Sequence, residues 1–438
     1  MAYGQTSGHL PYESASKTGH IPLIADPLVS RLLSVFQEKG TVEPEEKSPF
    51  PLRWIQTEGM ETGIETVIAC DGSFTEVHRD ACDLVYLRAG VQRMPVHSEK
   101  KALHPFRMQK LILENSDCVQ SVLPADIPGL SLREFEIRMR RAIFETCRSK
   151  PQILATLRWL YTEGWTGSPK ALPPVHCPNC GAVLDLTWKS EDTCPCGEPV
   201  FLTDLLEWEK DIPNSENRVT LAGRFMLILE FLLLLALIRE IWEMRPEELE
   251  RTLFLHDGPL SLGGRYTRMI LPMRAFLTYA AKSGHPVYLC GVEKTGRFAN
   301  HLQALKVSSP EHGFSYAVPS RGYIQKDVDG RPLSAGHKYG ERALLGERVF
   351  VLLPGKRELI LSVPSGLTRN VLNRPLPEDL IGLEKILGTI PALVTPIYDN
   401  ALFPISRVNS LVSIAQEPCG HMLELFSETF LKGGDSSA

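Results

Sequence analysis

The sequence has little excess charge, no long uninterrupted hydrophobic run and no leader of the secretory type. Its formal net charge is −5 over 438 residues, so no overall basic field attracts nucleic acid. Residues 1–17 lack the apolar segment that secretory signals carry. The most apolar stretch, Phe225–Ile238, contains Glu230 and is too short to span a bilayer. We therefore expect a cytoplasmic protein without a membrane span, in which this stretch is a buried core helix.

A disulfide framework is also missing from the cysteine pattern. Six of the ten cysteines are scattered along the chain, and several of these lie in apolar runs. This usage is typical of a reducing compartment rather than of a secreted, disulfide-linked protein.

The other four cysteines form two close pairs, in "CPNCG" at 177–181 and "CPCG" at 194–197. Two close pairs of thiolates about a dozen residues apart fit a tetrahedral zinc site. The second pair is one residue tighter than usual, and idle reduced thiols are the alternative. Because four ligands leave no open position, we predict a structural Zn²⁺ bound by Cys177, Cys180, Cys194 and Cys196.

The composition, 43% hydrophobic and 23% charged, is that of a folded globular protein. The length predicts one large domain with insertions, or two to three domains. We divide the chain into an N-terminal helical arm (1–50), a first part of the core (51–170), a zinc-ribbon insertion (171–205), a second part of the core (206–430) and a disordered tail (431–438).

Two distant apolar runs each meet an Asp-Gly dipeptide. We expect a strand that breaks at Asp71-Gly72, followed by a second strand over 81–94 that pairs with it as a hairpin. Another strand ends at Asp257-Gly258, and a similar one leads to Lys294. Strand ends can bring such side chains together at one edge of a sheet.

Two further segments have clear local patterns. Residues 347–366 predict a hairpin, because two apolar runs flank a Pro-Gly-Lys turn. Residues 131–150 have helical spacing. Their cationic side chains predict a basic face: Arg138, Arg140, Arg141, Arg148 and Lys150.

The carboxylates carry the chemistry that the sequence suggests. Asp71 and Asp257 could hold metal ions against a phosphodiester, and oxygen ligands favour Mg²⁺ or Mn²⁺. Glu230 is a third candidate, because an unpaired ionised carboxylate inside an apolar helix is costly. A metal ion would remove this cost, and a partner arginine or a raised pKa is the alternative. Glu240, near the polar end of the same helix, is its rival. Lys294 could contact a phosphate oxygen or the attacking water.

These motifs occur in one order in a known family. Asp-Gly-Ser at 71–73, a glutamate in a long apolar helix, "HDGPLSL" at 256–262 and "GVEKTGRF" at 291–298 resemble the NurA nucleases. Segments 10–20 and 337–354 resemble the bacterial members that carry an inserted zinc ribbon. The resemblance covers nearly the whole chain.

The resemblance implies an α/β fold with a ribonuclease H-like mixed sheet, flanking helices and the zinc-ribbon insertion. It implies a DNA nuclease that uses Mn²⁺ or Mg²⁺ and acts as a homodimer with a hexameric HerA-type ATPase. The family's site residues fall on Asp71, Glu230, Asp257 and Lys294. DNA end processing in repair and defence against foreign DNA both fit such a partnership.

The C-terminal motif departs from the family. Asn409 stands where an acid or imidazole is expected, and its amide oxygen would bind a metal more weakly; Asp399 is a candidate substitute. Two other functions stay open. One is a catalytically inactive adaptor of the ATPase, and the other is a zinc-ribbon nucleic-acid binder whose carboxylates are incidental.

Overall fold

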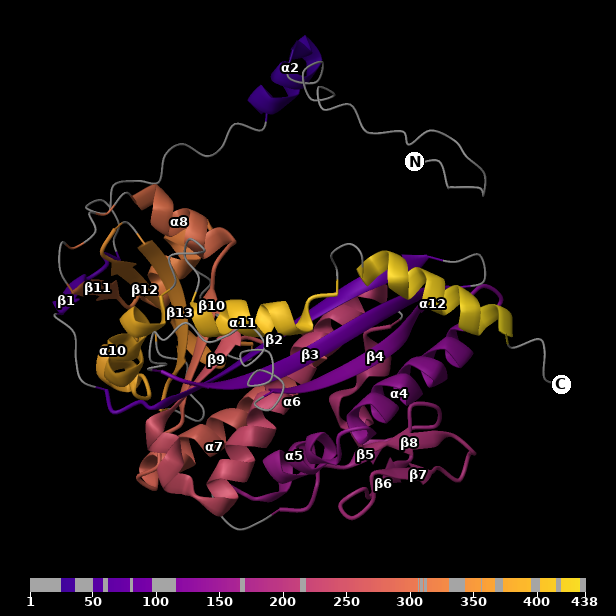
Figure 1. Cartoon of the computed structure of the whole chain (residues 1–438). Helices are drawn as coiled ribbons and strands as arrows, with labels where there is room; N and C mark the ends of the chain where they lie inside the picture. The colour runs from indigo at the N-terminus through magenta and orange to yellow at the C-terminus, as the bar shows by residue number, and fades with distance from the viewer. Residues whose placement is uncertain are drawn as a thin grey trace, which may run out of the picture.

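The computed structural model (Figure 1) gives the arrangement of most of the chain. The residues that it describes are 25–35, 50–57, 62–78, 82–96, 116–165, 170–212, 218–305, 307, 310, 313–330, 343–355, 357–366, 373–394, 402–414 and 419–433. Most of the predicted N-terminal arm, the segment 10–20, Asp399 and the last five residues lie outside this set. The division into parts stays a prediction.

A nine-stranded mixed sheet forms the centre of the molecule, in the order β1-β11-β12-β13-β10-β9-β2-β3-β4. β3 runs antiparallel to its neighbours β2 and β4, β9 runs parallel to β2, and β10 runs parallel to β9. The strands are β1 (Ile55–Thr57), β2 (Thr66–His78), β3 (Asp83–Pro95), β4 (Ser116–Asp126), β9 (Thr252–Asp257), β10 (Tyr288–Glu293), β11 (Phe314–Ala317), β12 (Gly346–Leu353) and β13 (Arg357–Pro364).

Five of these strands make a recognisable unit. Three antiparallel strands, β2 to β4, are followed after a helical crossover by β9 and β10, which lie parallel beside β2 in the order β4-β3-β2-β9-β10. This is the topology of the ribonuclease H-like fold, so the predicted fold class is confirmed.

Helices cover both faces of the sheet. The helices among the described residues are α2 (Pro27–Val35), α4 (Leu132–Arg148), α5 (Pro151–Thr162), α6 (Arg218–Met244), α7 (Ile270–Lys282), α8 (Arg297–Leu305), α9 (Arg321–Tyr323), α10 (Leu383–Leu393), α11 (Phe403–Val412) and α12 (Cys419–Gly433), and α2 is not among those that pack on the sheet. Side chains alternate along a strand, so Ile68 and Cys70 join the core beneath α4 to α7, whereas Val67 and Ala69 join the core beneath α10 and α11. These two cores sandwich the strands that carry the candidate site.

Helix α6 is the longest helix described, with 27 residues. By length and composition Val219–Met244 could cross a membrane, but 72% of its most apolar window is buried inside the protein. Packing against the sheet and against α5 accounts for its all-round apolar surface. The expectation of a buried core helix is confirmed, although the helix is longer than the apolar run that revealed it.

The predicted hairpins and helix are confirmed. β2 pairs with β3, β12 pairs with β13, and α4 is capped at its N-terminus by Ser131, which forms a capping box with Glu134. The expected break at Asp71-Gly72 is wrong. β2 continues through both residues to His78, because β3 pairs with it along its whole length.

The predicted basic face of residues 131–150 is also wrong in part. Arg140 is 1% exposed and binds two carboxylates of the cysteine-rich insertion. Arg148 pairs with Glu145 and Glu191, and Lys150 pairs with Asp117. The helical spacing predicted where the cations lie, but not that most of their acidic partners come from other parts of the chain.

Candidate active site

The four cysteines of the insertion form a compact cluster that can hold one metal ion. It lies among four short strands, β5 (Val175–His176), β6 (Val183–Leu184), β7 (Glu191–Thr193) and β8 (Pro199–Phe201). All four sulfur atoms lie within 4.8 Å of one another. The Sγ atoms of Cys177 and Cys196 are 3.7 Å apart, and those of Cys180 and Cys194 are 3.4 Å apart. Sulfurs bound to zinc at about 2.3 Å would stand roughly 3.8 Å apart in a tetrahedron, so the set fits zinc.

The insertion is fixed to α4 by buried ion pairs. The Arg140 guanidinium donates to Glu198 Oε1 at 2.7 Å and to Asp204 Oδ1 at 2.9 Å. Its charged group also lies over the ring of Phe201, which stacks on Phe144 of α4. Removing one partner from such a buried pair is expensive, so the insertion and the sheet form one packed structure.

The catalytic candidates Asp71 and Asp257 lie side by side at a split in the sheet. Pairing between β2 and β9 runs from Thr66 to Cys70, and its last pair joins Cys70 to His256. The next residues on the two strands are therefore Asp71 and Asp257, which share the face covered by α10 and α11 because side chains alternate. The parallel register itself brings the two carboxylates together.

The surroundings of Asp71 disfavour the charged form of its carboxyl group. It is only 6% exposed, and its Oδ2 atom is buried without a hydrogen-bond partner. Burial raises the pKa of Asp71 to about 7, assisted by the negative charges of Asp257 and Glu230 and opposed by the Gly72 N–H and by Lys294. A group held near neutrality by burial and like charges is poised to bind a cation.

Glu230 reaches the same place from the opposite face. A Cβ atom on Gly72 would stand 2.4 Å from Glu230 Oε1, so the carboxylate rests directly against the β2 backbone. Glu230 is 2% exposed, whereas Glu240 is exposed on the same helix. Of the two rivals, the structure brings only Glu230 to the sheet.

His256 is a site residue that the sequence argument missed. Its ring is fully buried, stacks on Phe231 at 4.6 Å and places Nε2 2.9 Å from Glu230 Oε2. Burial opposes the charged form of His256, but the adjacent Glu230 carboxylate outweighs it and raises the pKa. The position of this histidine directly before Asp257, on the alternate face of the strand, was the available signal.

Lys294 follows β10 and turns back to Asp257. Its Nζ atom lies 2.7 Å from Asp257 Oδ2, and its side chain is 26% exposed. The preceding Glu293 forms a buried pair with Arg348, 2.8 Å apart, which fixes the end of β10. The ammonium group is therefore held at the rim of the carboxylate site.

Asn409 does not share this burial. It is exposed on α11, a helix that packs on β2 and β3 beside Asp71. The carboxylates of Asp71, Glu230 and Asp257 also lie too far apart to form a complete set of metal ligands as they stand. Among the described residues, the four cysteines form the only group of three or more candidate ligands with all atoms within 4.8 Å. Asp71, Glu230 and Asp257 share one neighbourhood, in which a bound cation would have to draw them closer.

The similarity of this chain to known proteins is distant. No family model matches the sequence, and no curated protein matches it. The chain resembles the crystal structure of the NurA nuclease from Sulfolobus solfataricus at 9% identity, with a TM-score of 0.35 over 97% of this chain and 100% of that one.

Two further solved structures are similar at the same low level. A NurA structure bound to dAMP and manganese matches at 12% identity and a TM-score of 0.28, covering 94% of this chain and 98% of that one. Endonuclease V from Bacillus subtilis matches at 10% identity and a TM-score of 0.26, covering 86% and 88%. Function is therefore inferred below from the residues of the site.

Proposed function

We propose that this protein is a metal-dependent nuclease that hydrolyses phosphodiester bonds in DNA. The observation that carries the proposal is the buried, unpartnered Oδ2 atom of Asp71, beside Asp257 and Glu230 at the split between β2 and β9. Buried polar atoms normally have partners. Because two further carboxylates, Asp257 and Glu230, lie beside this unpartnered oxygen atom of Asp71, the arrangement favours a divalent cation there.

The donor set fits Mn²⁺ or Mg²⁺, because all three side chains offer hard oxygen atoms. Asp71, Asp257 and Glu230 would hold the metal, with His256 keeping the Glu230 carboxylate against the backbone at Gly72. When bound, such ions supply an activated water and neutralise charge that develops on the phosphate.

Lys294 would serve the substrate rather than the metal. Its ammonium group is fixed by Asp257 and is partly exposed, so it can donate to a non-bridging phosphate oxygen beside the carboxylates. The zinc site would have a structural role, since its four sulfur ligands leave no open coordination position.

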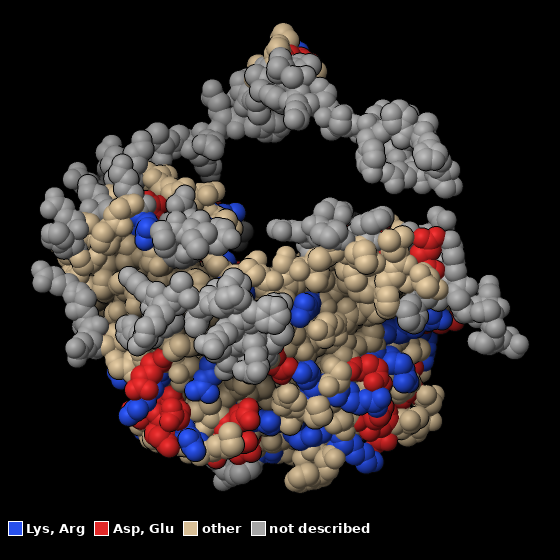
Figure 2. All heavy atoms as spheres, in the orientation of Figure 1, with Lys and Arg blue, Asp and Glu red and all other residues tan. Residues whose placement is uncertain are grey.

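We propose further that a homodimer of this chain works with a HerA-like hexameric ATPase, in DNA end processing or in defence against foreign DNA. The support is electrostatic. The net charge is −5, and acidic and basic side chains intermingle over the α4 to α7 part of the face in Figure 2. A chain with little long-range attraction for DNA benefits from a motor that delivers the substrate.

A second function is favoured by one observation. Asn409 is neutral and exposed, whereas a fourth metal ligand should lie in the site. A catalytically weak, NurA-like adaptor of the ATPase would tolerate this loss. However, such an adaptor would have no physical need to keep the carboxylates of Asp71, Asp257 and Glu230 close together.

The deciding experiment is a cleavage assay on linear and circular DNA with Mn²⁺, with Mg²⁺ and with no divalent ion, with and without the ATPase and ATP. Dialysis supplies the metal-free arm, because a chelator would also attack the zinc site. We expect cleavage that needs the divalent ion and disappears in Asp257→Asn. Cleavage by Asp257→Asn at the wild-type rate would contradict the site, and no cleavage under any condition would favour the adaptor.

A further inference from the structure

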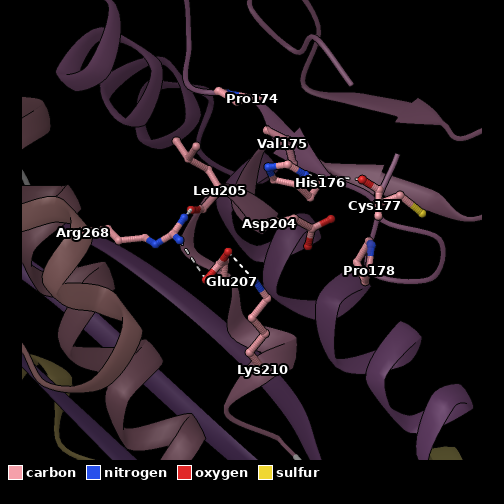
Figure 3. Close-up of a pocket in the computed structure, with 11 residues that line it drawn as sticks. Pro174, Val175, His176, Cys177, Pro178, Asp204, Leu205, Glu207, Lys210 and Arg268 are labelled. Atoms are coloured by element: carbon pink, nitrogen blue, oxygen red, sulfur yellow. Dashed lines mark hydrogen bonds and ion pairs between the residues drawn. The ribbon is translucent and has the colours of Figure 1, made fainter. Parts of the chain in front are cut away.

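A cavity of about 360 Å³ lies between the zinc ribbon and the core (Figure 3). One wall belongs to the first cysteine pair and includes Cys177 and Pro178. The other wall includes Glu207, Lys210 and Arg268. We propose that this cavity binds a backbone phosphate of the nucleic-acid strand, away from the bond that is cut. The inference rests on the proposed nuclease function and assigns a second contact for its substrate.

Two cations converge on one carboxylate in this cavity. Arg268 Nη2 lies 2.9 Å from Glu207 Oε2, and the Lys210 ammonium contacts Glu207 Oε1. The cationic side chains are 47% and 45% exposed, whereas that of Glu207 is 10% exposed. A ligand entering from solvent therefore meets the positive groups first. Both groups bind phosphate well, the guanidinium through a planar fork of donors.

The charge in the cavity favours an anion. Asp204 also lines it, but both oxygens of this carboxylate are held from behind by Arg140, at 2.9 Å and 2.5 Å. Arg140 also pairs with Glu198, which Arg133 contacts in turn, so two arginines balance two carboxylates behind the cavity. Of the other charged residues that line the cavity, Lys210 and Arg268 are cationic and Glu207 is acidic.

Glu207 is held in an unusual conformation that keeps the cations in place. Its φ of 55° makes it the only non-glycine residue with positive φ among those described. Such a conformation persists where the surroundings impose it. Here it follows the helical turn η2 (Leu202–Leu206) and directs the carboxylate toward Lys210 and Arg268, as Figure 3 shows. The cations are thus ordered before any ligand arrives.

Aromatic contacts connect the cavity to α6, the helix that carries Glu230. The ring of Trp208, next to Glu207, packs 4.6 Å from Tyr266 and 5.2 Å from Phe225. Phe225 precedes Glu230 by five residues, or about 7.5 Å along the helix. Arg268 lies in η5 (Gly264–Met269), which follows Asp257 after a short loop. The cavity lies on the α4–α7 side of the sheet, whereas Asp71 and Asp257 share the α10–α11 face, so a strand that contacts both passes around the end of β9.

The test measures binding of a labelled 12-nucleotide single strand to the full chain with no added divalent ion. We expect Arg268→Gln to weaken binding about tenfold at low salt and to lower the slope of log Kd against log salt by about one, as loss of one phosphate contact requires. Arg251→Gln is the matched control. This arginine is also exposed and paired, with Glu65, but it lies at the opposite end of β9.

Lys210→Gln repeats the test if Arg268→Gln alters zinc content or thermal unfolding. Equal affinities and salt slopes for the Arg268 and Arg251 variants would overturn the proposal, as would no binding by the wild type. Thymidine 5′-monophosphate is the second probe. A loss confined to this mononucleotide would replace the strand by a free nucleotide. Mn²⁺-dependent cleavage by the wild type is scored separately, so the nuclease proposal can stand when this site fails.

Discussion

Asp71-Gly72 and Asp257-Gly258 have the same side chains but opposite surroundings. Asp71 lies inside a 13-residue strand, whereas Asp257 ends a strand of six residues. Gly72 leaves room for the Glu230 carboxylate, whereas Gly258 has a φ of 111° and turns the chain away from β9. The same dipeptide thus admits a ligand in one strand and ends the other.

The two carboxylates differ in the same way. Asp71 has an unpartnered buried oxygen and a raised pKa, whereas Asp257 is bound by Lys294. The charged form of Asp71 is disfavoured unless a cation binds, whereas Asp257 is already paired with the Lys294 ammonium group. If both hold the same metal, removing either should stop the reaction, but the consequences for the empty protein should differ.

The largest expected effect is on cleavage by Asp71→Asn and Asp257→Asn. Each change removes an anionic ligand, so we expect a loss of about 10³-fold or more in cleavage rate with Mn²⁺. Single-turnover rates on linear DNA measure it, with Asp117→Asn, a surface pair of Lys150, as the control. Retained activity in only one of the two variants would show that the carboxylates do not share a metal.

The next effect separates the two glutamates of α6. Glu230→Gln keeps the shape but removes the charge beside Gly72, so we expect about a 10²-fold loss of activity and weaker Mn²⁺ binding. Glu240→Gln, on the exposed side, should change neither. Calorimetric Mn²⁺ titrations and cleavage rates test both, and equal behaviour of the two variants would place the helix ligand elsewhere.

The two glycines should fail differently. Gly72→Ala puts a methyl group where Glu230 Oε1 and the Met226 side chain now lie, so we expect cleavage to fall about tenfold as the carboxylate moves. Gly258→Ala forces an alanine into positive φ and should cost mainly stability, about 1–3 kcal/mol. Denaturant unfolding and cleavage rates, measured together, distinguish them. The opposite pattern would exchange the roles of the two glycines.

A further effect concerns the stability of the metal-free protein rather than its activity. Because the pKa of Asp71 is raised, its favourable contribution is present below the ordinary Asp pKa and is lost as pH rises through about 7. Asp71→Asn should therefore be about 2–4 kcal/mol more stable than wild type at pH 8 and should lose this advantage near pH 4. Asp257→Asn should show no comparable gain, since it leaves Lys294 without its partner. Unfolding curves between pH 4 and 8 test the contrast, and added Mn²⁺ should reverse it.

Local sequence patterns predicted much of the fold. The hairpin β12–β13, the capped start of α4 and the buried α6 follow from turn residues, a capping box and apolar content within short windows. The cysteine cluster could also be predicted from a short segment, because its two pairs lie within 20 residues of each other. The topology came from the resemblance, since no single window contains the crossover that places β9 beside β2.

The predictions that were wrong or missing share one physical cause. In each case the structure depends on a partner residue that is distant in the sequence. β2 does not break at Gly72, because β3 pairs with it beyond that point. Arg140 is not a surface cation, because Glu198 and Asp204 fold back over it. His256 gave no periodic signal, and its role becomes visible only when Glu230 is placed 2.9 Å away.

The continuous pairing of β2 with β3 also sets how this site can move. Asp71 is carried by a ladder in which every residue from Thr66 to His78 has a partner. Amide protons within such a ladder exchange with solvent through large openings of the sheet. Deuterium uptake should therefore be slow at Cys70. Asp71 is then a fixed point in any motion that admits or releases a substrate.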